Sequence, residues 1–123
     1  MNDPGNKRVA VLVVEDEHLI RVDIASSLES LGFIVYEAAN AADAIRCLEL
    51  HNEIRLIFTD VNMPGSMDGV ALAHYVRTRW PPIKIMVTSG YIQDKGLPTG
   101  VLFVAKLYYA NNIAHQMNEL IAA

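Results

Sequence analysis

Polar side chains that could carry phosphoryl chemistry stand at the ends of apolar runs in this sequence. They are Glu15, Asp16, Asp60, Thr88 and Lys106. Three carboxylates held close together repel one another, and a divalent cation removes that conflict. A site with few protein oxygen ligands and room for phosphate suits Mg²⁺. One carboxylate can then attack phosphorus, while a hydroxyl and an ammonium group stabilise the charge on the phosphoryl oxygens. The residue types therefore predict an aspartate that accepts a phosphoryl group.

Each of these residues also has a plain structural alternative. Glu15 and Asp16 could cap the start of a helix, and Asp60 could form a turn after a strand. Lys106 could be a solvated surface lysine, as most lysines are. These alternatives explain the residues one at a time, but not their shared position at strand ends. Asp68 is different, because an N-cap of the next helix explains it without any role in metal binding.

The elements that must position these side chains alternate along the chain. The continuous β-branched run 9–14 suits a strand that is buried on both faces. The spacing of Ile20, Ile24, Leu28 and Leu31 predicts a helix with these side chains inward. The predicted strands span residues 9–14, 33–38, 55–60, 83–88 and 101–105, and the predicted helices span 17–31, 40–51 (with Asn40 as N-cap), 70–80 and 111–122. This alternation predicts an α/β fold with a parallel sheet, whose site lies at the carboxyl ends of the strands.

Together these features resemble the response-regulator receiver domain of two-component signalling. The resemblance covers about residues 8–121 and rests on Glu15-Asp16, the stretch 60–69, Thr88-Ser89 and Lys106. It implies a doubly wound, flavodoxin-like sheet of five strands in the order 2-1-3-4-5, with helices on both faces. It also implies that residues 1–123 form one receiver domain of the single-domain type.

The resemblance implies a role for each acidic residue. Asp60 would accept the phosphoryl group from a histidine kinase or a histidine phosphotransfer protein. Asp16 and Glu15 would hold Mg²⁺ together with Asp60, helped by the backbone carbonyl of Asn62. The domain would then signal to a downstream protein by protein–protein contact, assisting only its own phosphorylation and dephosphorylation.

On the other side of the site, the resemblance implies that Thr88 and Lys106 bind the phosphoryl oxygens. Thr88 and Phe103 would be switch residues, although plain core packing explains Phe103 equally well. Two departures from the family pattern stand out. Leu107 replaces the usual proline after the lysine, which puts a cis peptide bond there in question. The segment 90–100 lacks helical periodicity, so the fourth helix of the family is expected to be short or absent.

Composition narrows the class of protein further. The 123 residues suit one domain, and the hydrophobic share of 52% allows a continuous core. A net charge of -4 with scattered basic residues argues against a nucleic-acid surface. Cys47 is the only cysteine, which excludes an internal disulfide. The apolar run that follows the polar N-terminus is too short for a signal peptide or a membrane span, so a cytoplasmic protein is predicted.

Two rival functions remain at this stage. A binding module of the same fold could act without phosphorylation, and Leu107 together with the short segment before the fifth strand motivates that alternative. An aspartate-nucleophile phosphatase generally wants a second aspartate two residues past the nucleophile, where this sequence has Asn62. Since the chain stops after its last helix, the sequence predicts a stand-alone receiver, and it does not decide between a monomer and a homodimer.

Overall fold

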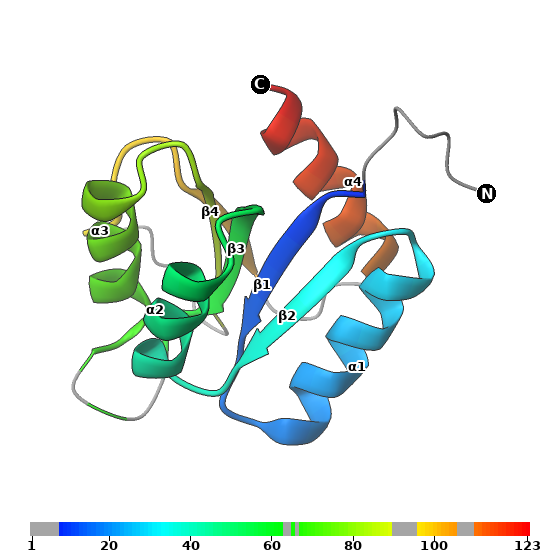
Figure 1. The fold of residues 1–123 in the computed structure, drawn as a ribbon, viewed down its shortest axis with the longest axis horizontal. Helices are drawn as coiled ribbons and strands as arrows, with labels where there is room; N and C mark the ends of the chain where they lie inside the picture. The colour runs from blue at the N-terminus through cyan, green and yellow to red at the C-terminus, as the bar shows by residue number, and fades with distance from the viewer. Residues whose placement is uncertain (1–7, 63–64, 66, 90–95, 106–109) are drawn as a thin grey trace.

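The protein forms one five-stranded parallel sheet with helices on both faces (Figure 1). The computed structural model describes residues 8–62, 65, 67–89, 96–105 and 110–123. The strands are β1 (Ala10–Val14), β2 (Ile34–Ala38), β3 (Ile54–Asp60), β4 (Lys84–Ser89) and β5 (Leu102–Ala105). The helices are α1 (His18–Ser30), α2 (Ala41–Leu50), α3 (Gly69–Arg79) and α4 (Ala110–Ala122). The strand order β2-β1-β3-β4-β5 confirms the predicted topology, and each predicted boundary lies within one residue of the observed one.

The side chains of the central strands alternate between two buried layers. On β1, Ala10, Leu12 and Val14 pack with the buried residues of α2 and α3, whereas Val11 and Val13 pack with those of α1 and α4. Figure 1 shows the same arrangement, with α2 and α3 on one face of the sheet and α1 and α4 on the other. A strand covered on both faces needs apolar side chains at every position, which is why β1 is an unbroken apolar run.

The predicted inward face of α1 is correct only in its middle. Ile24 and Leu28 are buried, but Ile20 is 38% exposed and Leu31 is 46% exposed. Leu31 lies beyond the last helical residue and is the C-cap, so it no longer follows the helical face. Ile20 belongs to the first turn of α1, and this end of the helix extends past the ends of the strands (Figure 1).

Two helices begin with side-chain caps at the positions that the sequence predicts. The Asn40 side chain accepts a hydrogen bond of 2.8 Å from the amide of Asp43, and the Asp68 side chain accepts one of 2.9 Å from the amide of Ala71. Such caps satisfy amides that have no partner within the helix. They therefore set where α2 and α3 start after the preceding loops.

The segment between β4 and β5 departs from helical structure where it is described. Residues 96–101 consist of turns and irregular backbone, with positive φ at Gly96 and Gly100. Helix α3 holds this segment, because His74 bonds to the carbonyl of Gly96 and Arg77 donates to the carbonyl of Thr99. The rest of the expected short helix, residues 90–95, lies outside the described residues. None of the four described helices combines the length and the apolar character needed to cross a bilayer.

Candidate functional site

Three strands end at the same edge of the sheet and bring the predicted site residues together. Asp60 closes β3 and pairs with Thr88 of β4, and Glu15 follows β1 directly. Paired residues on neighbouring parallel strands point to the same side of the sheet. The acceptor candidate and the hydroxyl therefore lie side by side, with the acidic pair on the other neighbouring strand.

The carboxylates of Glu15, Asp16 and Asp60 form one cluster. A carboxylate oxygen from each of them lies within 4.8 Å of the other two. Glu15 and Asp60 are each only 3% exposed, whereas Asp16 is exposed to solvent. Buried carboxylates that repel one another are unfavourable unless a cation or hydrogen bonds compensate. An all-oxygen donor set with one solvent-facing member fits a hard divalent ion that keeps some of its waters.

Backbone amides orient two of these carboxylates. The amide of Asn62 donates to Oδ1 of Asp60 at 2.9 Å, and the amide of Glu17 donates to Oε2 of Glu15 at 3.0 Å. Glu17 is the N-cap of α1, and its side chain makes no cap hydrogen bond. Glu15 and Asp16 both precede the N-cap position, although the Glu15 carboxylate does accept from an amide at the start of this helix. Both residues are directed into the cluster.

Thr88 carries a buried hydroxyl with an unusual environment. The residue is 2% exposed, and its Oγ1 makes no hydrogen bond among the residues that the structure describes. Its backbone is well tied, because the carbonyl of Thr88 accepts from the amide of Val61 at 2.9 Å. A buried hydroxyl without a partner costs about 1–3 kcal/mol. Such a group beside Asp60 is a ready donor to an oxygen that arrives with a ligand.

Gly69 lies against the backbone of Asp60, and the sequence did not predict this role. A Cβ at this position would lie 2.1 Å from the backbone oxygen of Asp60 and 2.7 Å from Cα of Val61. The amide of Gly69 donates to the carbonyl of Val61 at 2.8 Å, so the start of α3 rests directly on the end of β3. The available signal was a glycine placed inside a helix start, where it is otherwise unfavourable.

The far side of the predicted site is only partly described. Phe103 lies on β5, partly buried, and packs against the core layer on the side of α2 and α3. Its register partner on β4 is Val87, one residue before Thr88. Lys106 and its peptide bond to Leu107 lie outside the described residues.

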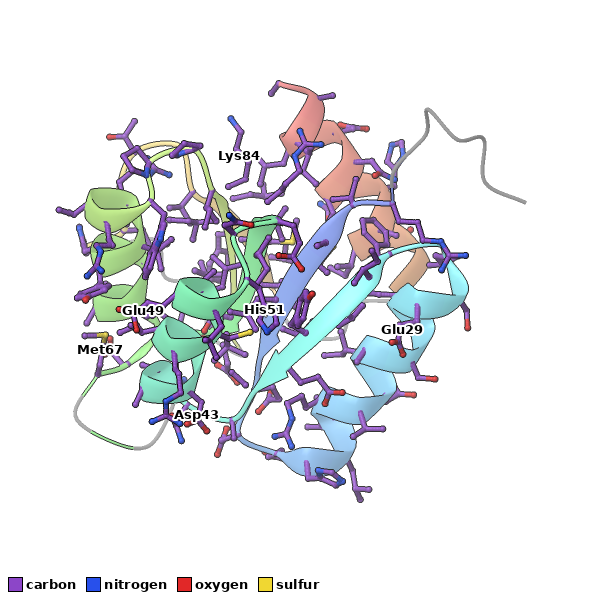
Figure 2. The ribbon with its side chains drawn as sticks, in the orientation of Figure 1. Glu29, Asp43, Glu49, His51, Met67 and Lys84 are labelled. Carbon is purple, nitrogen blue, oxygen red and sulfur yellow. The ribbon has the colours of Figure 1, made fainter. Side chains whose placement is uncertain are left out.

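A hydrogen-bonded pair with shifted pKa values lies at the start of β3. The Tyr36 hydroxyl donates a hydrogen bond to the Glu53 carboxylate, which raises the pKa of Tyr36 and lowers the pKa of Glu53. The ring of His51 stacks on Tyr36 with 4.2 Å between the centroids, and Figure 2 shows His51 beside β2. Glu53 precedes β3, whereas Asp60 ends it, so this group belongs to the opposite edge of the sheet.

Comparison with known proteins agrees with this architecture. The family model for the response regulator receiver domain matches residues 11–105. The sensor kinase CckA of Brucella abortus is 34% identical over 117 residues, which cover 90% of this chain and 12% of that protein. The hydrogenase transcriptional regulatory protein HoxA of Cupriavidus necator is 33% identical over 97 residues, or 79% of this chain and 20% of that protein. The chain thus corresponds to a small part of these relatives.

Solved structures give the same result. A response regulator receiver protein from Sinorhizobium medicae superposes with a TM-score of 0.84 at 25% identity, covering 95% of this chain and 97% of that chain. The receiver domain of the hybrid histidine kinase CckA superposes with a TM-score of 0.76 at 32% identity, covering 91% and 98%. The fold, the acidic edge and these matches together show the family. The chain belongs to the response-regulator receiver domain family of two-component signalling.

Proposed function

We propose that this receiver domain, over about residues 8–121, accepts a phosphoryl group on Asp60 in a two-component phosphorelay, with Mg²⁺ as cofactor. The observation that carries the proposal is the cluster of three carboxylates within 4.8 Å, next to a buried hydroxyl that has no partner among the described residues. One of the relatives is a sensor kinase by name, and one of the similar structures is the receiver domain of a hybrid histidine kinase. Both names support a histidine kinase or a histidine phosphotransfer protein as the donor. The signal then passes to a downstream protein by direct contact.

Asp60 acts as the nucleophile in this scheme. A P–O bond forms to one of its carboxylate oxygens while the P–N bond to the donor's imidazole breaks. The amide of Asn62, 2.9 Å from Oδ1, orients the carboxylate for this attack. Asp16 and Glu15 hold the cation together with Asp60 and the backbone carbonyl of Asn62. When bound, Mg²⁺ supplies positive charge for the phosphoryl oxygens.

Thr88 and Lys106 complete the phosphoryl site in the proposal. The Thr88 hydroxyl donates to a phosphoryl oxygen, and this bond would give the buried group the partner that it lacks among the described residues. Lys106 supplies a second positive charge. Phe103, the register partner of Val87 next to Thr88 in the chain, is the second switch residue of the proposal.

Intact-mass analysis tests the acceptor. The wild-type protein should gain one phosphoryl group on treatment with acetyl phosphate and Mg²⁺, and Asp60→Asn should gain none. Asp43→Asn is a matched control, because Asp43 lies on α2 and is not one of the clustered carboxylates. No gain by the wild type, or an equal gain by Asp60→Asn, would overturn the proposal.

The alternative of a binding module without phosphorylation has less support. A degenerate site would have no reason to keep two carboxylates buried beside each other, and Glu15 and Asp60 are both buried here. No described feature favours it over phosphoryl capture. A phosphatase activity likewise lacks its acid, since Asn62 stands where the second aspartate is needed.

A further inference from the structure

The guanidinium of Arg21 joins three elements at the acidic edge. From α1, its Nη1 donates to the backbone carbonyl of Glu15 at 2.8 Å, and its Nε donates to Oε1 of Glu37 at 3.2 Å. A third nitrogen, Nη2, lies 2.9 Å from Nδ1 of His18. The Arg21 side chain is only 14% exposed. One side chain on α1 therefore connects the end of β1 to the end of β2.

The carbonyl that Arg21 holds belongs to the peptide unit between the first two acidic residues. Fixing this unit limits the directions in which both carboxylates can point. The amide of Glu15 is held from the other side by the carbonyl of Ala38 at 3.0 Å, and its carboxylate by the amide of Glu17. The turn from Glu15 to Asp16 is thus secured at its amide, its carbonyl and one side chain.

Arginine suits this position better than any other cation. Its planar guanidinium presents several N–H donors in a fixed fork, whereas a lysine ammonium is a point charge on a flexible stem. Glu37 is 39% exposed and pairs in register with Val13 of β1, which sets its carboxylate next to the turn that follows β1. This carboxylate aligns the guanidinium and offsets its charge.

Charge and position predict opposite effects on cation binding. A positive guanidinium close to three carboxylates opposes the binding of another cation. If charge were its whole effect, a neutral residue at position 21 would strengthen Mg²⁺ binding. If the hydrogen bond to Glu15 has a larger effect than the charge, any replacement that removes the guanidinium would weaken Mg²⁺ binding. This includes a replacement by lysine, which keeps the charge.

We infer that Arg21, aligned by Glu37, is a positioning residue that holds Glu15 and Asp16 in the arrangement that Mg²⁺ requires. This inference rests on the proposed function, since it concerns the same cation site. Residues that orient metal ligands typically change metal affinity by about 10–100-fold when replaced. The inference gives the end of β2 a function in the site, through a residue that itself touches no phosphoryl group.

The test compares Arg21→Lys and Arg21→Met with the wild type and with Arg46→Lys as control. Arg46 lies on α2 and its side chain is 70% exposed, so its replacement should leave the site unchanged. Mg²⁺ is titrated while the amide resonance of Asn62, bonded to Asp60, is followed by NMR. Both Arg21 variants should show a Kd for Mg²⁺ that is higher by about tenfold. With acetyl phosphate, the apparent Mg²⁺ constant should rise by the same factor while the limiting rate stays within about twofold.

Three outcomes decide between the explanations. Tighter Mg²⁺ binding by Arg21→Met, or unchanged binding by Arg21→Lys, would overturn the positioning role and leave the proposed function intact. A wild-type protein that shows no response to Mg²⁺ would overturn both. Urea unfolding of each variant identifies a general loss of stability. If Arg21→Met does not fold, the Mg²⁺ affinity of Arg21→Lys, which keeps the charge, tests the positioning role.

Discussion

Replacing Thr88 with valine should make the protein more stable and its phosphorylation slower. Valine has nearly the shape of threonine but carries no hydroxyl. In the folded protein the Thr88 hydroxyl is buried and has no hydrogen-bond partner among the described residues, whereas in the unfolded chain water satisfies it. Burial of an unsatisfied polar group costs about 1–3 kcal/mol, so Thr88→Val should recover about 1 kcal/mol or more. For a domain of this size, that gain corresponds to a rise in Tm of about 4 °C.

Thr59 provides a matched control on the neighbouring strand. It is fully buried like Thr88, but its hydroxyl donates to the backbone oxygen of Asp60 at 3.0 Å. Thr59→Val removes this bond and should lower stability by about 1 kcal/mol, or about 4 °C in Tm. The two identical substitutions should therefore shift Tm in opposite directions, which differential scanning calorimetry in Mg²⁺-free buffer can resolve.

Phosphorylation should respond differently. A hydrogen bond to a charged group contributes about 1.5–3 kcal/mol. Losing the Thr88 donor should therefore slow the reaction with acetyl phosphate by about tenfold or more, because 1.4 kcal/mol corresponds to a factor of ten. The reasoning fails if Thr88→Val melts below the wild type to the same extent as Thr59→Val. That result would mean that the hydroxyl already has a partner in the folded protein.

Two further predictions concern backbone packing and pH. Gly69→Ala should lower the free energy of unfolding by about 2 kcal/mol or more, because the added Cβ would lie 2.1 Å from the backbone oxygen of Asp60. Urea unfolding measures this loss, and an unchanged midpoint would contradict the close approach. Tyr36→Phe should flatten the acid side of the stability curve. The hydrogen bond from Tyr36 lowers the pKa of Glu53, so the stability it contributes is present above the unfolded-state pKa and is lost as pH falls through the folded-state pKa. Urea midpoints between about pH 3 and pH 6 check this, and parallel curves for the variant and the wild type would refute it.

Local patterns were enough to predict most of the elements. A short, unbroken and largely β-branched apolar run favours a strand that is covered on both faces, and β1 is such a strand. The caps at Asn40 and Asp68 involve only residues within three positions, so sequence alone locates them. The acidic edge could also be predicted, because the carboxyl ends of parallel strands meet wherever the alternation of strands and helices is clear.

Features that depend on distances between elements could not be predicted. The inward face of α1 was wrong at Ile20, because its exposure depends on how far the helix extends beyond the strands. The requirement for glycine at position 69 comes from the approach of α3 to the backbone of Asp60. The unsatisfied hydroxyl of Thr88 depends on what surrounds it in three dimensions.

The sequence by itself determined the order of the elements, the family resemblance and the set of residues able to hold a cation and a phosphoryl group. It could do so because periodicity and residue chemistry are local properties. Tertiary structure alone decided that three carboxylates lie within 4.8 Å and that Arg21 connects the ends of β1 and β2. That connection spans 16 positions of sequence between Arg21 and Glu37, and it exists only because the register of β1 and β2 brings Glu37 next to Val13, close to the turn that Arg21 holds.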